Sequence, residues 1–300
     1  YIGNKRALLP FINEGIIFVK KHLSKDSLVI LDGFSGSGVV SRLFKYHAKE
    51  LYSNDLEDYC EIINKCYLSN KSEVNLDFIE SNIDWLNNHK LDVLKKTPGF
   101  IESNYAPADD NNIKKGERVF YTNKNAKIID NLKYLINKKI DKKKRHFFLA
   151  PLIVKASINT NTSGVFKGFH KKDGFGWFGG RGENALTRIK KEIKLDLPVF
   201  SERECRVEIL KEDINKLVKS NKICKEYDLA YYDPPYNQHP YGSNYFMLNI
   251  IASPRSNVEI QDGISGIAKS WNRSAYNKRN IAETAFENLI KNTYAKYILI

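Results

Sequence analysis

One tetrapeptide in this 300-residue chain combines an acid, two prolines and an aromatic ring: Asp233-Pro234-Pro235-Tyr236. It directly follows residues 227–232, an apolar run typical of a buried strand. The prolines restrict the backbone, so the Asp233 carboxylate and the Pro234 carbonyl become acceptors with set directions, next to the Tyr236 ring. Such a segment suits an enzyme that holds an amino group on a flat ring. Taken alone, the same residues are also compatible with an ordinary turn.

A glycine-rich turn follows another apolar run. Residues 28–32 predict a short strand, residues 33–38 read Gly-Phe-Ser-Gly-Ser-Gly, and residues 39–46 have a helical pattern. Gly36 and Gly38 allow a ligand to approach the backbone, and the next helix presents unpaired N–H groups, as in nucleotide-binding α/β folds. Asp55 ends the next predicted strand, where it would accept hydrogen bonds from ribose hydroxyls or cap the following helix.

Strands and helices alternate at both ends of the chain. Residues 1–68 predict helix, strand, turn, helix, strand and helix, and the alternation resumes from residue 205 to residue 300. Between them, residues 126–139 and 147–156 predict helices without strands. The pattern indicates a parallel α/β sheet interrupted by an insert.

The composition is basic, with 48 Lys and Arg against 35 Asp and Glu and a formal net charge of +13. A polyanionic partner would explain this excess, and so would a host genome rich in A and T. The cysteines at 60, 66, 205 and 224 have no C-x-x-C spacing, so we expect buried thiols and no metal. Without a long apolar stretch or a leader, we expect no membrane association and a cytoplasmic, intracellular location. Because the chain starts at Tyr1 and stops within an apolar run at Ile300, we expect a fragment whose sheet continues further.

The order of these features resembles the D12 class, with α-group motif order, of N6-adenine-specific DNA methyltransferases. The segment from Tyr1 to Lys5, the turn at 32–38, a long insert and the tetrapeptide at 233–236 carry the resemblance. It implies a doubly wound, mostly parallel Rossmann-like sheet in an S-adenosylmethionine-dependent catalytic domain, residues 1–69 and 201–300. Residues 70–200 would be a mainly helical or loop insert that contains the DNA target-recognition region.

The implied reaction moves a methyl group from S-adenosylmethionine to N6 of an adenine that is flipped out of double-stranded DNA. The implied setting is a prokaryotic restriction–modification system, in which a cognate restriction endonuclease is a candidate partner. Asp233 and the Pro234 carbonyl would accept the two N6 hydrogens, Pro235 would stiffen the segment, and Tyr236 would stack on the base.

The resemblance also assigns the donor site. Lys5 would pair with the donor carboxylate, Asp32 with its α-amino group, and Asp213 with its adenine amine, where the adjacent Glu212 is the alternative. The full set of expected donor-binding residues is Tyr1, Lys5, Asp32, Phe34, Gly36, Gly38, Asp55 and Asp213. Asn244 and Tyr245 would frame the flipped base, or they form an Asn-capped turn.

Two parts of the insert are candidates for DNA contact. The first is the basic run Lys142, Lys143, Lys144 and Arg145, which is a phosphate clamp or a solvated loop. The second spans residues 164–182 and holds seven of the 17 glycines, several aromatic rings, and the cations Lys167, Lys171, Lys172 and Arg181. This segment would face DNA or cover the active site, or it folds its rings onto the core.

Three other functions share parts of this pattern. N4-cytosine methylation uses the same geometry on another exocyclic amine, and RNA adenine is a further acceptor. The third is a donor-binding, DNA-binding subunit without catalysis, which would not need the acceptor arrangement of Asp233-Pro234-Pro235-Tyr236.

Overall fold

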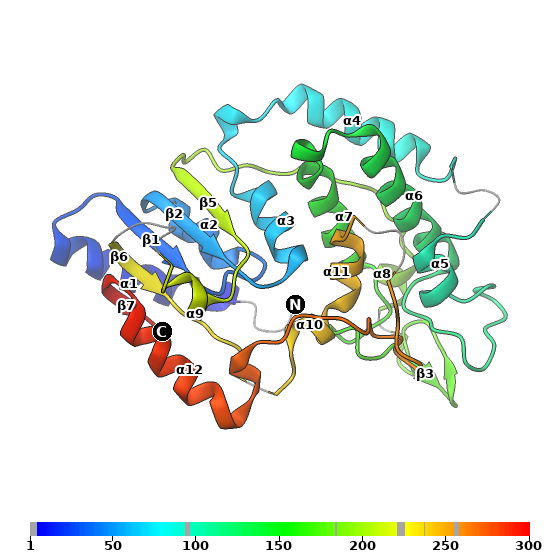
Figure 1. Ribbon diagram of the computed structural model, residues 1–300. Helices are drawn as coiled ribbons and strands as arrows, with labels where there is room; N and C mark the ends of the chain where they lie inside the picture. Colours follow the sequence, from blue (N-terminus) through cyan, green and yellow to red (C-terminus); the bar gives the residue numbers. More distant parts are fainter. Residues whose placement is uncertain (1–4, 94–96, 184, 221–225, 237, 255–257) are drawn as a thin grey trace. The chain divides into compact units, whose positions relative to one another are not determined.

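The computed structural model of this protein describes residues 5–93, 97–183, 185–220, 226–236, 238–254 and 258–300. The chain divides into two compact units, each made of segments that are distant in the sequence (Figure 1). The sheet unit comprises residues 3–74, 199–240 and 272–300. The helical unit comprises residues 1–2, 75–198 and 241–271.

Five parallel strands form the centre of the sheet unit, in the order β5-β2-β1-β6-β7. Their bounds are β1 Leu28–Asp32, β2 Ala48–Asn54, β5 Arg206–Leu210, β6 Tyr227–Tyr231 and β7 Ala295–Leu299. The chain adds β2 and β5 on one side of β1, and β6 and β7 on the other. The strand order therefore reverses between β1 and β6, and in such sheets ligands bind outside the carboxyl ends of the strands at this point.

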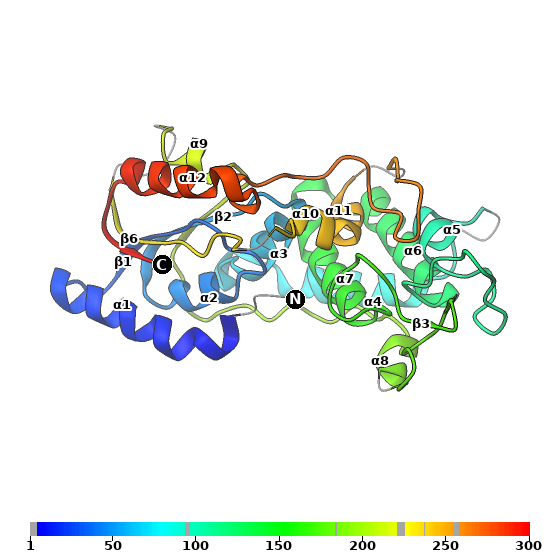
Figure 2. The ribbon, with the colours of Figure 1, turned by 90° about the horizontal axis from the view of Figure 1, so that it is seen from below.

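Alternate residues of β1 pack against helices on opposite faces of the sheet. Leu28 and Ile30 lie in one core with α1 (Leu9–Leu23) and α2 (Val39–Lys45). Val29 and Leu31 lie in a second core with α9 (Ile214–Leu217) and α12 (Arg279–Asn292). Figure 2 shows these two helix layers on either side of the strands. Because both faces are covered, β1 is a continuous apolar run rather than an alternating one.

The rest of the sheet unit consists of one further helix and short 3-10 turns. These elements are α3 Asp58–Tyr67, η1 Lys5–Leu8, η2 Lys71–Glu73 and η4 Ala275–Asn277. The expected fold class, a parallel α/β sheet with helices on both faces, is confirmed by the strand order and by the two cores.

Helices make up most of the helical unit. They are α4 Leu76–His89, α5 Phe100–Tyr105, α6 Asn123–Lys139, α7 His146–Ile158, α8 Leu186–Lys190, α10 Tyr241–Asn244 and α11 Phe246–Ala252, with the turn η3 Lys142–Lys144. A short hairpin pairs β3 (Lys171–Lys172) with β4 (Phe175–Gly176). Helices α6 and α7 contain the two segments predicted to be helical, and each extends a few residues beyond the apolar pattern.

Two buried polar residues of α6 hold neighbouring helix ends. The Asp130 carboxylate accepts hydrogen bonds from the backbone N–H of Ile101 (3.0 Å) and Glu102 (2.8 Å) at the start of α5. One turn later in α6, the Lys133 ammonium donates to the carbonyl of Ile250 in α11 (2.6 Å). The start of a helix has unpaired N–H groups, and its end has unpaired carbonyls. The negative Asp130 therefore binds N–H groups at a helix start, and the positive Lys133 binds a carbonyl near a helix end.

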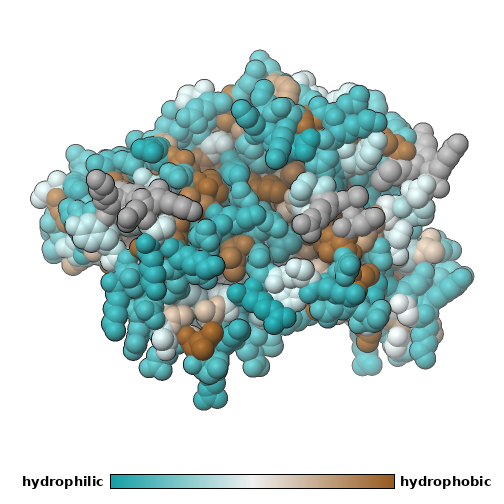
Figure 3. Space-filling view, in the orientation of Figure 1, coloured by the Kyte–Doolittle hydropathy of each residue, from teal (hydrophilic) through white to brown (hydrophobic). Residues whose placement is uncertain are grey.

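The face in Figure 3 is largely hydrophilic, with separate small hydrophobic areas, as the basic composition leads one to expect. Within the described ranges, no helix is long and apolar enough to cross a membrane. Cys60, Cys66 and Cys205 are buried free thiols, and the fourth cysteine, Cys224, lies outside the described residues.

Replacing Asp130 by alanine should destabilise the helical unit, because one buried and one partly buried N–H group at the start of α5 lose their acceptor. We expect Asp130→Ala to lower the free energy of unfolding by about 2 kcal/mol in urea titrations followed by circular dichroism. The exposed Asp84 of α4 gives the matched control, and Asp84→Ala should change it by less than about 0.5 kcal/mol. Equal losses in both variants would contradict this role of Asp130.

Candidate active site at the carboxyl ends of β1 and β6

The turn after β1 needs glycine at two close approaches. A Cβ on Gly33 would lie 2.6 Å from the Tyr232 ring, and a Cβ on Gly38 would lie 2.0 Å from Oδ1 of Asn64. Gly36 and Gly38 also have positive φ, at 52° and 74°. The glycines therefore shape a tight turn directly outside the sheet.

Two asparagines that the sequence analysis did not single out hold this turn. The Asn64 amide donates to Oγ of Ser35 (2.9 Å) and to the carbonyl of Gly36 (3.3 Å). The Asn54 amide donates to the carbonyls of Gly33 and Glu212, both at 3.1 Å, and its oxygen accepts from the N–H of Glu212 (3.1 Å). Asn54 thus joins the turns after β1 and β5. Asn64 lies within α3, where no sequence pattern marks its role.

Asp55 is bound to the same turn. Its Oδ2 accepts from the N–H of Gly36 (2.8 Å), and its Oδ1 accepts from the N–H of Glu57 (3.0 Å). Burial raises the pKa of Asp55, while these two hydrogen bonds lower it. The hydrogen bond to Glu57 matches the alternative in which Asp55 supports the start of the following helix, and the expected contact to ribose stays a prediction.

Asp32, the last residue of β1, is completely buried. Its Oδ2 accepts from the Ser41 hydroxyl (2.6 Å), and its Oδ1 has no hydrogen-bond partner within the described residues. Burial raises the pKa of Asp32 to about 7, and hydrogen bonding from Ser41 and from the backbone of Phe34 opposes this shift. The nearby charges of Asp55 and Asp233 act in the same direction as burial. A buried carboxyl oxygen without a partner costs free energy, so a cation or a hydrogen-bond donor that binds there would be stabilised.

Asp233 follows β6, which pairs with β1 in the register that sets Asp32 opposite Tyr231. The Asp233 side chain is 30% exposed, and its Oδ2 lies 3.0 Å from the Lys5 ammonium, which is 18% exposed. The same ammonium lies 5.7 Å from the centre of the Tyr236 ring. Lys5 is thus paired with the acid after β6, and its expected contact with the donor carboxylate stays a prediction. Tyr236 itself is 69% exposed, so its ring face is available for stacking on another flat group.

The other expected donor residues of the sheet unit have contacts of their own. Phe34 packs edge-on against Tyr276, with ring centres 5.2 Å apart. Asp213 caps the start of α9 by accepting from the N–H of Lys216 (3.2 Å). Neither this contact nor the position of neighbouring Glu212 decides which of the two acids would bind the adenine amine of the donor, so that choice stays open. Tyr1 lies outside the described residues.

Asn244 and Tyr245 belong to the helical unit and are buried there. The carbonyl of Asn244 accepts from the N–H of Phe166 (2.8 Å), and the Tyr245 ring stacks on Tyr241 at 5.8 Å. These contacts give both residues a packing role, and their expected contact with the flipped base stays a prediction.

The basic run after α6 is only partly available for phosphate contact. Arg145 donates to the carbonyls of Ile140 (3.0 Å) and Asn137 (2.5 Å), and so satisfies the end of α6. The Lys144 ammonium lies over the Phe78 ring, 4.4 Å from its centre. Lys142 and Lys143 are exposed.

The glycine-rich segment divides its rings between core and solvent. Phe166 and Phe178 are buried, whereas Phe175 and Trp177 in and beside β4 are 44% and 38% exposed. The cations Lys171 and Lys172 of β3 are exposed and lie over ring faces, at 5.1 Å from Phe169 and 4.8 Å from Trp177. The remaining candidate cations are Lys167, half-buried, and Arg181, exposed.

A single buried asparagine supports this hairpin. Asn161 donates to the carbonyls of Val119 (2.8 Å) and Trp177 (3.1 Å), and its oxygen accepts from the N–H of Gly179 (3.0 Å). The hairpin is therefore anchored on the helical unit through backbone atoms, and it presents exposed rings and cations together.

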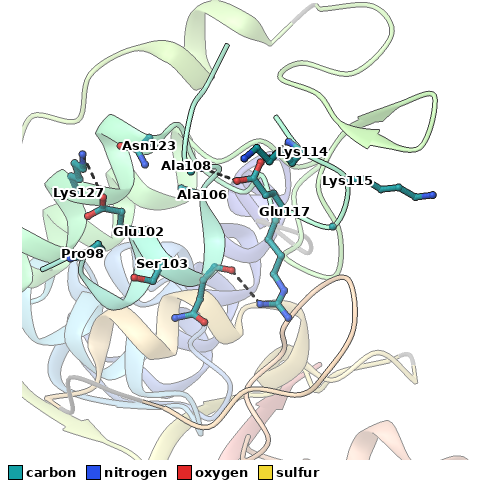
Figure 4. A pocket seen from close by; sticks show the side chains of 13 residues that line it. Pro98, Glu102, Ser103, Ala106, Ala108, Lys114, Lys115, Glu117, Asn123 and Lys127 are labelled. Carbon is teal, nitrogen blue, oxygen red and sulfur yellow. Dashed lines mark hydrogen bonds and ion pairs between the residues drawn. The ribbon is translucent and has the colours of Figure 1, made fainter. Parts of the chain in front are cut away.

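An open hollow of about 720 Å³ also lies in the helical unit (Figure 4). Its acids are already used, since Glu117 accepts from the N–H of Ala108 (2.9 Å) and Glu102 pairs with Lys127 (3.4 Å). Most residues that line the hollow have polar or charged side chains, and among the described residues none of them has a buried unpaired group that would indicate a ligand. Among the described residues, no group of three potential metal ligands lies together.

A parallel α/β sheet with a glycine turn at the strand-order reversal is the arrangement found in nucleotide-binding α/β enzymes, and Asp32 and Asp233 both lie at this point of the sheet. Residues 1–299 match the family of D12 class N6 adenine-specific DNA methyltransferases, and the chain belongs to this family. It is therefore an adenine-specific DNA methyltransferase, and its substrate is DNA.

Curated relatives are similar over the whole chain. The type II methyltransferase M.NlaIII of Neisseria lactamica is 27% identical, and M.CviAII of Paramecium bursaria Chlorella virus 1 is 29% identical; each match covers all of this chain and 82% of the relative. The modification methylase StsI of Streptococcus sanguinis is 28% identical over all of this chain and 43% of its own length. No solved structure matches.

In the protein without ligand, ionisation of the buried Asp32 side chain should lower the stability of the folded state. The unfolded chain loses this proton near pH 4 and the folded chain near pH 7, so the contribution of Asp32 to stability falls as pH rises between these values. We expect Asp32→Asn to raise the melting temperature by about 5 °C at pH 8 and by much less at pH 5. The exposed Asp26 provides a control, Asp26→Asn, that should show no such pH dependence in thermal melts. A gain that is equal at both pH values would count against a neutral Asp32.

Proposed function

We propose that this protein transfers a methyl group from S-adenosylmethionine to N6 of an adenine that is extruded from duplex DNA. The observation that carries the proposal is the juxtaposition of Asp32 and Asp233 at the carboxyl ends of two paired strands. Asp32 suits the positively charged methyl donor, and Asp233 suits the amine that accepts the methyl group. The pairing of β1 with β6 brings these two acids close together.

The residues around the turn after β1 fit the donor. S-adenosylmethionine supplies an electrophilic methyl group on a sulfonium, and it also has an ammonium and a ribose. The buried Oδ1 of Asp32 lacks a partner within the described residues and suits the ammonium. Asp55 suits the ribose hydroxyls, and Phe34, Gly36 and Gly38 would line the same side. Asp213 or Glu212 would reach the donor's adenine amine.

Asp233 and the Pro234 carbonyl would act on the acceptor. The lone pair of adenine N6 is delocalised into the ring, which makes the amine a weak nucleophile. Two acceptors that each take one N6–H favour a pyramidal nitrogen, whose lone pair then points out of the ring plane. Tyr236 would hold the ring by stacking, and Pro235 keeps the backbone of the segment in place. The carboxylate orients the amine, and the proton leaves after N6 has gained positive charge.

The helical unit would supply the DNA contacts. Its hairpin presents exposed Phe175 and Trp177 beside Lys171 and Lys172, a combination that suits phosphates and bases together. Lys142 and Lys143 add exposed cations, whereas Arg145 is engaged at the end of α6. We propose the segments 70–200 for target recognition, and 1–69 and 201–300 for catalysis, with residues 241–271 of the latter packed in the helical unit.

The curated relatives are type II methyltransferases and modification methylases. By analogy, we propose that this protein protects its host's sites from a cognate restriction endonuclease. A non-catalytic role would not require the acid, carbonyl and ring after β6.

Asp233→Ala should abolish methyl transfer because N6 loses its charged acceptor. Tritium transfer from labelled S-adenosylmethionine to unmethylated plasmid DNA should fall at least about a thousandfold, while S-adenosylhomocysteine binds within about tenfold of the unsubstituted protein. Lys21→Ala, on the outer end of α1, should retain activity. Full activity of Asp233→Ala would refute the catalytic assignment, and nucleoside analysis of the product would identify the methylated base.

Removing the hairpin cations should weaken DNA binding in a salt-dependent way. For the double variant Lys171→Ala/Lys172→Ala, we expect the slope of log Kd against log salt to fall by about one to two, as each lost phosphate contact predicts. The double variant Lys21→Ala/Lys49→Ala removes the same charge from exposed sites of the sheet unit and should leave the slope unchanged. Identical effects in the two variants would assign the change to net charge alone.

A further inference from the structure

Lys5 makes the two contacts that the target amine is proposed to make. Its ammonium lies 3.0 Å from Oδ2 of Asp233 and 5.7 Å from the centre of the Tyr236 ring. An extruded adenine would donate its N6–H to the same carboxylate and stack on the same ring. An ammonium is a hydrogen-bond donor with positive charge, and it satisfies a carboxylate and a ring face in the same way.

Lys5 is held at this place by the fold. It is the first residue of η1, which leads directly into α1, and α1 packs on the sheet through Ile12, Ile16 and Val19. Its long side chain is 18% exposed, so it is mostly covered yet still open to solvent. Such a side chain can leave Asp233 without unfolding any element.

The charge that develops during transfer disfavours a lasting contact between Lys5 and Asp233. N6 becomes positive as the methyl group arrives, and the Asp233 carboxylate stabilises this charge. A second positive charge 3.0 Å from the same carboxylate would weaken this stabilisation. Methyl transfer is therefore favoured when Lys5 has withdrawn.

We propose that Lys5 is a placeholder for the target amine, which keeps Asp233 and Tyr236 in position until adenine displaces it. This inference rests on the proposed function of Asp233. Partly exposed ion pairs are weak, so the competition is expected to change the preference for the amine only about two- to fivefold.

Binding of duplexes with and without the amine tests the proposal. After the target site has been mapped by sequencing methylated adenines, two duplexes carry either adenine or purine there, opposite an abasic position that makes extrusion easy. The ratio of their Kd values, measured by fluorescence anisotropy without S-adenosylhomocysteine, whose carboxylate is an expected partner of Lys5, isolates the contribution of the amino group.

We expect Lys5→Met to increase the preference for adenine over purine about two- to fivefold, because the competitor is gone. Lys5→Arg keeps a cation at Asp233 and should retain the original ratio. A preference that is unchanged or reduced in Lys5→Met would overturn the proposal and make Lys5 a support for Asp233 instead. Purine binding and the melting temperature serve as folding controls for each variant.

Asp233→Ala separates this inference from the proposed function, because alanine has no side-chain acceptor. If Asp233 holds the amine, Asp233→Ala should abolish most of the preference for adenine, and Lys5→Met should then have no further effect. If Asp233→Ala keeps the full preference, the acceptor role of Asp233 fails whatever Lys5 does. If Lys5→Met leaves the ratio unchanged while Asp233→Ala loses it, only the placeholder role is rejected.

Discussion

The pairing of β1 with β6 is the constraint on which the site depends. It sets Asp32 opposite Tyr231 and thereby fixes Asp233 near the turn after β1. Both strands are buried on both faces, so a shift in register would break two hydrophobic cores at once. The acids are thus held together by apolar packing rather than by an attraction of their own, and their charges in fact repel one another.

This repulsion gives the site its electrostatic character. Asp32 is fully buried and has Asp55 and Asp233 nearby, so it favours its neutral form when no cation adjoins it. The Lys5 ammonium balances Asp233, and backbone N–H groups balance Asp55. Each of the three acids therefore has a different environment: Asp32 is buried with a raised pKa, Asp233 is in an ion pair, and Asp55 is bound by backbone N–H groups.

The sequence predicted the elements that have strong local patterns. The apolar runs of β1 and β6, the glycine turn and the helices α6 and α7 all have short-range signals. The contacts that depend on distant residues had no such signal. Asn64 is one polar residue within a helix, and Lys5 meets an acid from the other end of the chain. The basic run at 142–145 stays a prediction for phosphate contact, and composition does not reveal that Arg145 is bound to helix carbonyls.

The support of the hairpin has an evolutionary consequence. Asn161 binds only main-chain atoms of its neighbours, which are present whatever side chains the hairpin has. Substitutions at exposed positions such as Lys171, Lys172 and Phe175 can therefore accumulate without loosening the anchor. The exposed surface of the hairpin can therefore vary in sequence while the backbone that carries it keeps its place.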